Sequence, residues 1–212
     1  GRTAEILVAT DNAGLWHSPD LGIHWNRVED KTGFLTQESR VYAAFYSKSQ
    51  PSVLYVSIAT DGGNVVIRSQ DNGVSFTEVY RVTGSDSAIR AVAVDSRFSN
   101  QVFLGSRDGA LFETSDGGGS WRVRARFDDQ IRGILMDRSD SSSFFILLES
   151  GRVYRTKNSG AVFEEIEFDT GSDKDANVIG AGLHSVTHDT VPTRADISHH
   201  DVVPVALSHA GD

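Results

Sequence analysis

Thr114-Ser115-Asp116-Gly117-Gly118-Gly119-Ser120-Trp121 is the stretch that decides the fold, because its pattern occurs four times in the chain. The pattern is [Ser/Thr]-x-[Asp/Asn]-x-Gly-x-x-[Trp/Phe], and the other copies span residues 18–25, 69–76 and 156–163. Their third positions are 51, 45 and 42 residues apart. A period of about 40–50 residues filled with short β segments indicates a propeller or a solenoid.

Each copy has the composition of a turn between two strands. An Asp or Asn side chain accepts hydrogen bonds from nearby backbone amides, and Gly adopts backbone angles that other residues avoid. The aromatic residue then begins the next strand and packs under the turn. We therefore assign a structural role to the turn residues Asp20, Gly22, Trp25, Asp71, Gly73, Phe76, Asp116, Gly118, Trp121, Asn158, Gly160 and Phe163.

These turns resemble the Asp-box repeat, also called the BNR repeat, over about residues 5 to 168. Families that carry it include sialidases, xyloglucan-type glycoside hydrolases, sortilin-like receptors and a photosystem assembly factor. The resemblance implies a β-propeller and an extracytoplasmic location, that is periplasmic, secreted or lumenal. It implies no single activity, because these families perform different functions on one fold.

The repeats predict an all-β chain of four-stranded antiparallel blades, with about four to five blades within a single propeller domain. Each blade has strands A to D from the inside outwards, and the box turn joins C to D. The third repeat, for example, has strands at 89–94, 102–105, 110–113 and 120–125, with a hairpin turn at 107–109. The repeats cover about residues 5–28, 40–80, 89–126, 131–168 and, in part, 177–212.

The first and last repeats both look incomplete. The first begins with a B strand at residues 5–9, and the last offers only an A strand at 177–183 and a B strand at 201–208. Three interpretations follow: a piece of a six- to eight-bladed propeller, a ring of four blades closed by the last A strand, or open edges covered by a partner chain. An open edge invites pairing with another strand and is rarely left bare.

Composition limits the classes of partner. The 212 residues carry a net charge of −9, which argues against binding to nucleic acid through phosphate contacts. No apolar run approaches the ~20 residues that a membrane-spanning helix needs. Five of the seven histidines gather near the C-terminal end but match no closed metal motif, so we expect no metal and no cofactor.

An arginine recurs where the A strands begin, at Arg40, Arg90 and Arg132, and Asn177 takes this place in the last repeat. Inner strands begin near the mouth of the central channel, so these side chains are expected to converge there. Arginine makes rigid bidentate contacts with carboxylate and phosphate groups. The four residues are therefore a candidate site for an anionic group. The alternative is that each arginine pairs with a nearby acid, such as Glu38, Asp86 or Asp129.

A catalytic site would need acids from the loops between D and A strands. Asp128, Asp129, Asp86 and Glu38 could supply the carboxyl pair that glycoside hydrolysis requires. The chain lacks the Phe/Tyr-Arg-Ile-Pro motif of sialidases, and Arg40 lies instead in Ser39-Arg40-Val41-Tyr42. We therefore predict a non-catalytic binding or assembly module that holds a protein partner or belongs to a larger complex. The alternative is a carbohydrate-active enzyme.

Overall fold

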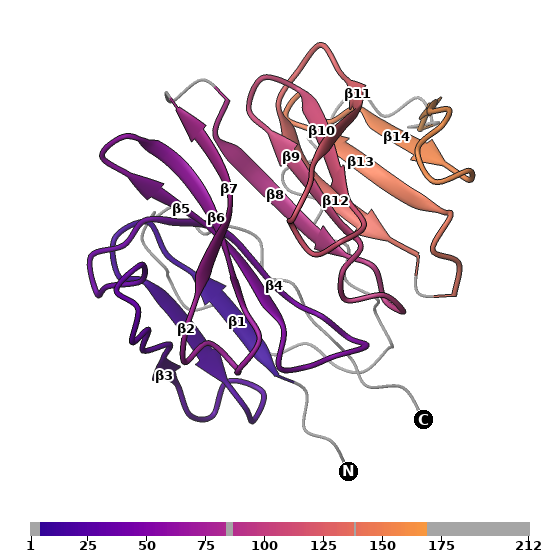
Figure 1. Ribbon diagram of the computed structural model, residues 1–212. Coiled ribbons are helices and arrows are strands. Elements are labelled where there is room, and N and C mark those ends of the chain that lie inside the picture. Colours follow the sequence, from indigo (N-terminus) through magenta and orange to yellow (C-terminus); the bar gives the residue numbers. More distant parts are fainter. Residues whose placement is uncertain (1–4, 84–86, 138, 169–212) are drawn as a thin grey trace, which may run out of the picture.

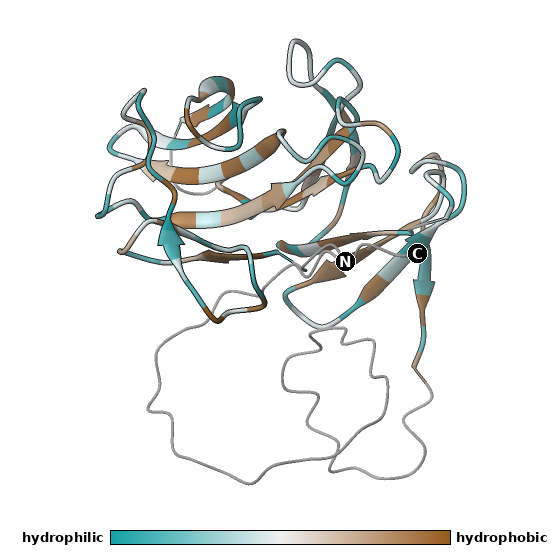
Figure 2. Cartoon of the chain, turned by 90° about the horizontal axis from the view of Figure 1, so that it is seen from below, coloured by the Kyte–Doolittle hydropathy of each residue, from teal (hydrophilic) through white to brown (hydrophobic). Residues whose placement is uncertain are grey.

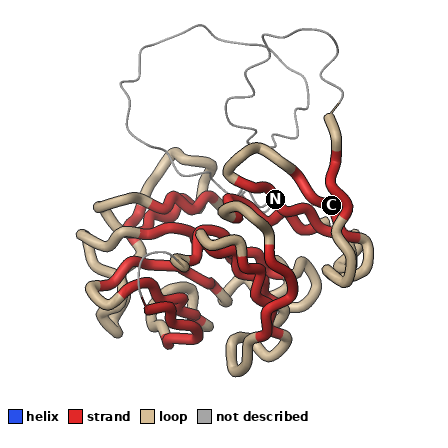
Figure 3. The backbone as a smooth tube through the Cα atoms, turned by 90° about the horizontal axis from the view of Figure 1, so that it is seen from above, coloured by secondary structure: helices blue, strands red, loops and turns tan. Residues whose placement is uncertain are grey.

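A computed structural model describes residues 5–83, 87–137 and 139–168. Every regular element of this part is a β-strand, and the strands form four antiparallel sheets (Figures 1 and 3). We name these sheets blades 1 to 4. The all-β propeller fold predicted from the repeats is confirmed.

Blade 1 has three strands, and blades 2 to 4 have four strands each in sequence order. Blade 1 contains β1 (Ile6–Ala9), β2 (Leu15–Ser18) and β3 (Asn26–Arg27), and blade 2 contains β4 (Val41–Tyr46), β5 (Leu54–Thr60), β6 (Gly63–Ser69) and β7 (Thr77–Thr83). Blade 3 contains β8 (Ile89–Val94), β9 (Val102–Ser106), β10 (Ala110–Thr114) and β11 (Arg122–Arg126). Blade 4 contains β12 (Ile131–Met136), β13 (Phe144–Leu148), β14 (Val153–Thr156) and β15 (Glu164–Ile166).

The sheets stack face to face, and a separate hydrophobic core fills each of the three interfaces. Val41 and Leu7 belong to the core between blades 1 and 2, and Val53 and Ile89 to the core between blades 2 and 3. The rings of Phe103 and Phe144 lie 4.7 Å apart in the core between blades 3 and 4. Hydrophobic residues follow the strands, whereas the connecting loops are mostly hydrophilic (Figure 2). Strands with a sheet on both sides therefore lose the alternation of a half-exposed strand.

The inner strands β4, β8 and β12 pack beside one another, and the outer strands β7, β11 and β15 lie at the opposite edge of each blade. Because consecutive strands are antiparallel, the starts of the inner strands lie at the same end of the blades as the hairpins between the second and third strands. The box turns lie at the other end. We call the first end the entry face, and it holds the predicted arginines.

The predicted strand and repeat that begin at residue 177, together with the C-terminal histidines, lie outside the described residues. Within the described residues no helix has the length and hydropathy to cross a membrane.

Candidate functional site

Each inner strand carries one extra residue near its start. Ile131 pairs with Leu148 and Gly133 with Leu147, so Arg132 is inserted between two paired residues as a β-bulge. The same irregularity falls at Arg90 in β8 and at Tyr42 in β4. Bulges re-aim side chains and are frequent next to functional sites. The equivalent bulge residues of blades 2, 3 and 4 are therefore Tyr42, Arg90 and Arg132.

This pairing register corrects the predicted equivalence of Arg40 with the other two arginines. The carbonyl oxygens of Arg40, Ala88 and Gln130 accept hydrogen bonds from the amides of Ala59, Arg107 and Glu149, which lie at or directly after the end of the second strand of each blade. Arg40 thus matches Ala88 and Gln130, two positions before the bulge. Counting back from Leu54, the first residue of β5, puts Tyr42 rather than Arg40 in line with the other two arginines. Tyr42, Arg90 and Arg132 each precede the first residue of the following strand by 12 positions.

Tyr42 and Arg90 join blades 2 and 3 across the entry face. The guanidinium carbon of Arg90 lies 3.9 Å from the centre of the Tyr42 ring. A cation over an aromatic ring at this distance is attracted by the ring's quadrupole. Arg90 Nε is buried and has no hydrogen-bond partner. Among the described residues, no acid forms an ion pair with Arg90.

Arg40 approaches Tyr42 from the side of blade 1. A hydrogen bond with the Tyr42 side chain raises the pKa of Arg40, and the charge of Asp11 raises it further. Arg40 Nε lies 2.6 Å from a carboxylate oxygen of Asp11, and both side chains are more than half exposed. Tyr42 therefore contacts both Arg40 and Arg90, although the sequence analysis did not single it out.

Arg132 continues this row into blade 4. Its Nε lies 4.0 Å from a carboxylate oxygen of Glu149, and about half of each side chain is exposed. An exposed pair at this distance is worth little and leaves the arginine available to a ligand. The acids near Arg40 and Arg132 are thus Asp11 and Glu149, rather than the predicted Glu38 and Asp129. Asn177 and Asp86 lie outside the described residues.

Four acids and one arginine, Arg107, also line a shallow hollow of about 460 Å³ on the entry face of blades 3 and 4, beside this row. Its carboxylates are Asp108, Asp128, Asp129 and Glu149.

The two predicted catalytic candidates in this hollow are engaged in structural contacts. Asp128 contacts Arg152, and this hydrogen bond lowers the pKa of the Asp128 carboxyl. Asp129 accepts hydrogen bonds from the backbone amides of Ser150 (2.8 Å) and Gln130 (2.7 Å), chiefly the first of which lowers its pKa. A general acid in glycoside hydrolysis needs a raised pKa, so neither residue has the properties of a proton donor.

The box turns share one hydrogen-bond pattern. The hydroxyl group at the first position accepts a bond from the amide of the box glycine at 2.7 to 3.0 Å. The Asp or Asn oxygen accepts a bond from the amide four residues later at 2.8 to 2.9 Å. The residue before each box glycine has a positive φ even where it is Leu21, Asn72 or Ser159. These contacts are local, which agrees with a structural role for the predicted box residues.

The structure resembles solved β-propellers, whereas no protein-family model and no curated protein matches the chain. The GH74 enzyme of Niastella koreensis has a TM-score of 0.62 and 20% identity, over 77% of this chain and 28% of that one. The GH74 xyloglucanase of Xanthomonas campestris has a TM-score of 0.61 and 16% identity, over 78% of this chain and 29% of that one.

A third similar structure is the extracellular domain of the putative one-component system BT4673 of B. thetaiotaomicron. It has a TM-score of 0.56 and 15% identity, over 80% of this chain and 22% of that one. The chain therefore spans less than a third of the length of these structures.

Proposed function

We propose that the chain is a non-catalytic binding module of the Asp-box propeller type, which holds an acidic segment of a protein partner on its entry face. The observation that carries the proposal is the row of bulge residues on adjacent inner strands, in which Arg90 is stacked on Tyr42 and Arg132 follows at the same register.

The chemistry of this row suits a carboxylate. The contact with the Tyr42 ring fixes the orientation of the Arg90 guanidinium. The N–H groups at the edge of the guanidinium can still donate to a ligand. A guanidinium held in this way can form two parallel hydrogen bonds with a carboxylate. The protein as a whole carries a charge of −9, so cations grouped on one face give an anionic ligand a defined place to bind.

Binding of a fluorescent octaglutamate peptide tests the proposal. The double variant Arg90→Gln/Arg132→Gln should bind this peptide at least about tenfold more weakly at low ionic strength, the effect of losing about 1.4 kcal/mol of interaction. The difference should shrink in high salt, because screening already weakens the wild-type contact.

A matched control removes the same charge from the opposite end of the blades. The variant Arg97→Gln/Lys157→Gln changes residues beside the turn after β8 and in the fourth box, and it should bind the peptide nearly as well as the wild type. Equal weakening by both double variants would mean that only net charge matters. Unchanged affinity in Arg90→Gln/Arg132→Gln, with a lower melting temperature, would mean that these arginines only stabilise loops.

A carbohydrate-active enzyme is the second candidate, favoured by the acid-lined hollow on the entry face and by the fold shared with the GH74 enzymes. This function requires release of reducing ends from a glucan such as xyloglucan, with loss of that activity in Asp128→Asn or Asp129→Asn. Because the pKa values of both carboxyls are lowered, neither of these two residues is suited to be the general acid of that reaction.

We also propose that the module works outside the cytoplasm, in a periplasmic, secreted or lumenal space. The similarity to an extracellular domain supports this location.

A further inference from the structure

Consecutive blades meet through one contact that recurs at all three interfaces. The residue three positions after a box aromatic, in the outer strand or directly after it, lies against the box glycine of the next blade. A Cβ added to that glycine would lie 2.9, 2.5 or 3.1 Å from this residue in the pairs Val28 with Gly73, Val79 with Gly118 and Arg124 with Gly160. The first two distances leave no room for a side chain and the third is tighter than ordinary contact, so the glycine accommodates the preceding blade.

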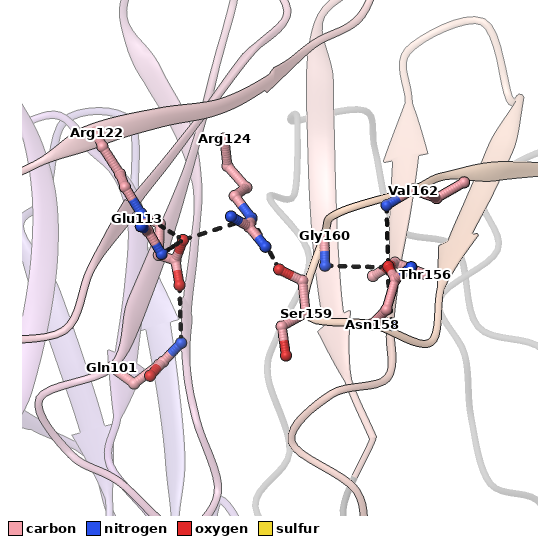
Figure 4. Close-up of polar contacts among 9 residues, drawn as sticks. All are labelled: Gln101, Glu113, Arg122, Arg124, Thr156, Asn158, Ser159, Gly160 and Val162. Carbon is pink, nitrogen blue, oxygen red and sulfur yellow. Dashed lines mark hydrogen bonds and ion pairs between the residues drawn. The ribbon is translucent and has the colours of Figure 1, made fainter.

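A second contact reinforces two of the interfaces. Arg68 Nη1 donates to the carbonyl oxygen of Gly117 at 3.5 Å, and Arg124 Nε donates to that of Ser159 at 2.9 Å. In both cases the acceptor belongs to the positive-φ residue just before the box glycine of the next blade. The buried Glu113 lies 3.6 Å from Arg124 and holds it toward blade 4 (Figure 4).

Blade 4 has the corresponding contact residues on its outward face. Among the described residues, however, no further blade lies against that face. Ile166 in blade 4 is equivalent to Val28 in blade 1 and Arg124 in blade 3. Arg155 in blade 4 is equivalent to Arg68 in blade 2. By register Ile166 and Arg155 share one sheet face with Leu135, Phe145, Leu147 and Val153. This face is largely apolar apart from the ion pair of Arg155 with Glu164 at 3.3 Å, and no described blade covers it: Leu135 is 47% exposed, whereas its counterpart Ala93 in blade 3 is 1% exposed.

Blade 1 exposes the face that, in the other blades, contacts the preceding blade. A Cβ at Gly22 would meet only its own blade, at 3.6 Å from Trp25 and 4.0 Å from Ile6. Trp25 is 40% exposed, whereas the box aromatic Phe76 of blade 2 is 3% exposed. Ile6 and Val8 are partly exposed, although their counterparts in β13 are fully buried.

We propose that the uncovered face of blade 4 receives blade 1 of a second copy of this chain, head to tail. Ile166 then lies against Gly22 of the second copy, and Arg155 donates to the carbonyl of its Leu21, whose φ of 60° matches that of the other acceptors. Residues 169–212 contain neither Trp nor Phe and no copy of the box pattern. That segment therefore does not supply the box that this face fits, whereas a second copy does.

Sedimentation of the full chain across the micromolar range tests the proposal. The wild type should associate, while Leu135→Glu and Ile6→Glu should each sediment as monomers, because each lacks one half of the contact. Mixing the two variants should restore association, since the blade 4 face of Ile6→Glu and the blade 1 face of Leu135→Glu are intact. Only a contact between two different faces predicts this rescue.

The control is Val123→Glu in β11, where Val123 is 48% exposed and belongs to neither end blade. It should associate like the wild type, and circular dichroism should show that every variant is folded. A wild type that stays monomeric, with the face covered by residues 169–212 or by another polypeptide, would overturn the proposal. So would folded variants that still associate alone, or a mixture that fails to associate.

Discussion

Individual side chains in the box turns act through local hydrogen bonds. Asp71 accepts bonds from the hydroxyl of Ser75 at 2.5 Å, from the amide of Ser75 at 2.9 Å and from Ser69 at 2.8 Å. These bonds lower the pKa of Asp71 from 3.8 to about 2. In the fourth box, Asn158 keeps the amide contact, at 2.9 Å from the amide of Val162, without a titratable group.

Asp71→Asn should therefore change how stability responds to acid. The folded-state pKa lies below the ordinary value, so the charged form stabilises the fold fully above about pH 4, and this contribution disappears as the pH falls through about 2. The wild type should melt several degrees above the variant at pH 7, and the difference should shrink steadily below pH 4. A difference that stayed constant down to pH 2 would show that the carboxylate charge has no part in the turn.

At the scale of the element, close approach between blades restricts residue size. Gly105 in β9 faces β12, and a Cβ there would lie 2.3 Å from Ile131 Cγ2 and 2.8 Å from its Cβ. No positive φ is involved at this position, so the constraint is the contact between blades 3 and 4.

Gly105→Ala should lower the free energy of unfolding by about 1–3 kcal/mol, the usual cost of overpacking a core. Gly62→Ala is the matched control, because a Cβ at Gly62 meets nothing within 4 Å. Chemical denaturation of both variants gives the comparison. Equal stabilities would mean that the sheets are farther apart than the structure shows.

The sequence predicted the most deeply buried inner strand best. Residues 89–94 were expected as an A strand, and β8 spans Ile89–Val94, where five of the six residues are buried. Outer strands were predicted less well: residues 120–125 were expected, but β11 spans Arg122–Arg126. Its side chains are largely exposed, so hydrophobic pattern does not define its ends.

The candidate site shows what a repeat alignment misses. Arg90 and Arg132 were aligned correctly, but Arg40 was misplaced and Tyr42 was overlooked. A bulge shifts the register by one residue without changing composition, and the Arg90–Tyr42 contact joins residues 48 positions apart. Each bulge residue lies 12 positions before the first residue of the next strand. This equal spacing could be recognised only when the observed starts of those strands were known.

At the scale of the whole molecule, the four described blades form an arc, and the inner strands of blades 2, 3 and 4 each bring one bulge residue to the entry face (Figure 1). The two end faces of this arc have no neighbouring blade among the described residues, and they carry the residues that the other blades use for contacts between blades. The proposed binding site lies at the start of the inner strands, whereas the proposed self-association involves the outward faces of blades 1 and 4, including Leu135 of β12.

The most direct measurement of the central claim follows the arginine Nε–H signals by NMR while a triglutamate peptide is added. Arg90 and Arg132 should shift together with one dissociation constant, whereas Arg68 and Arg155 should not shift. The response of Arg90 should disappear in Tyr42→Ala, where the stacked geometry is lost. Shifts spread evenly over exposed arginines, or an Arg90 signal that ignores the peptide, would contradict the claim that the entry face binds a carboxylate.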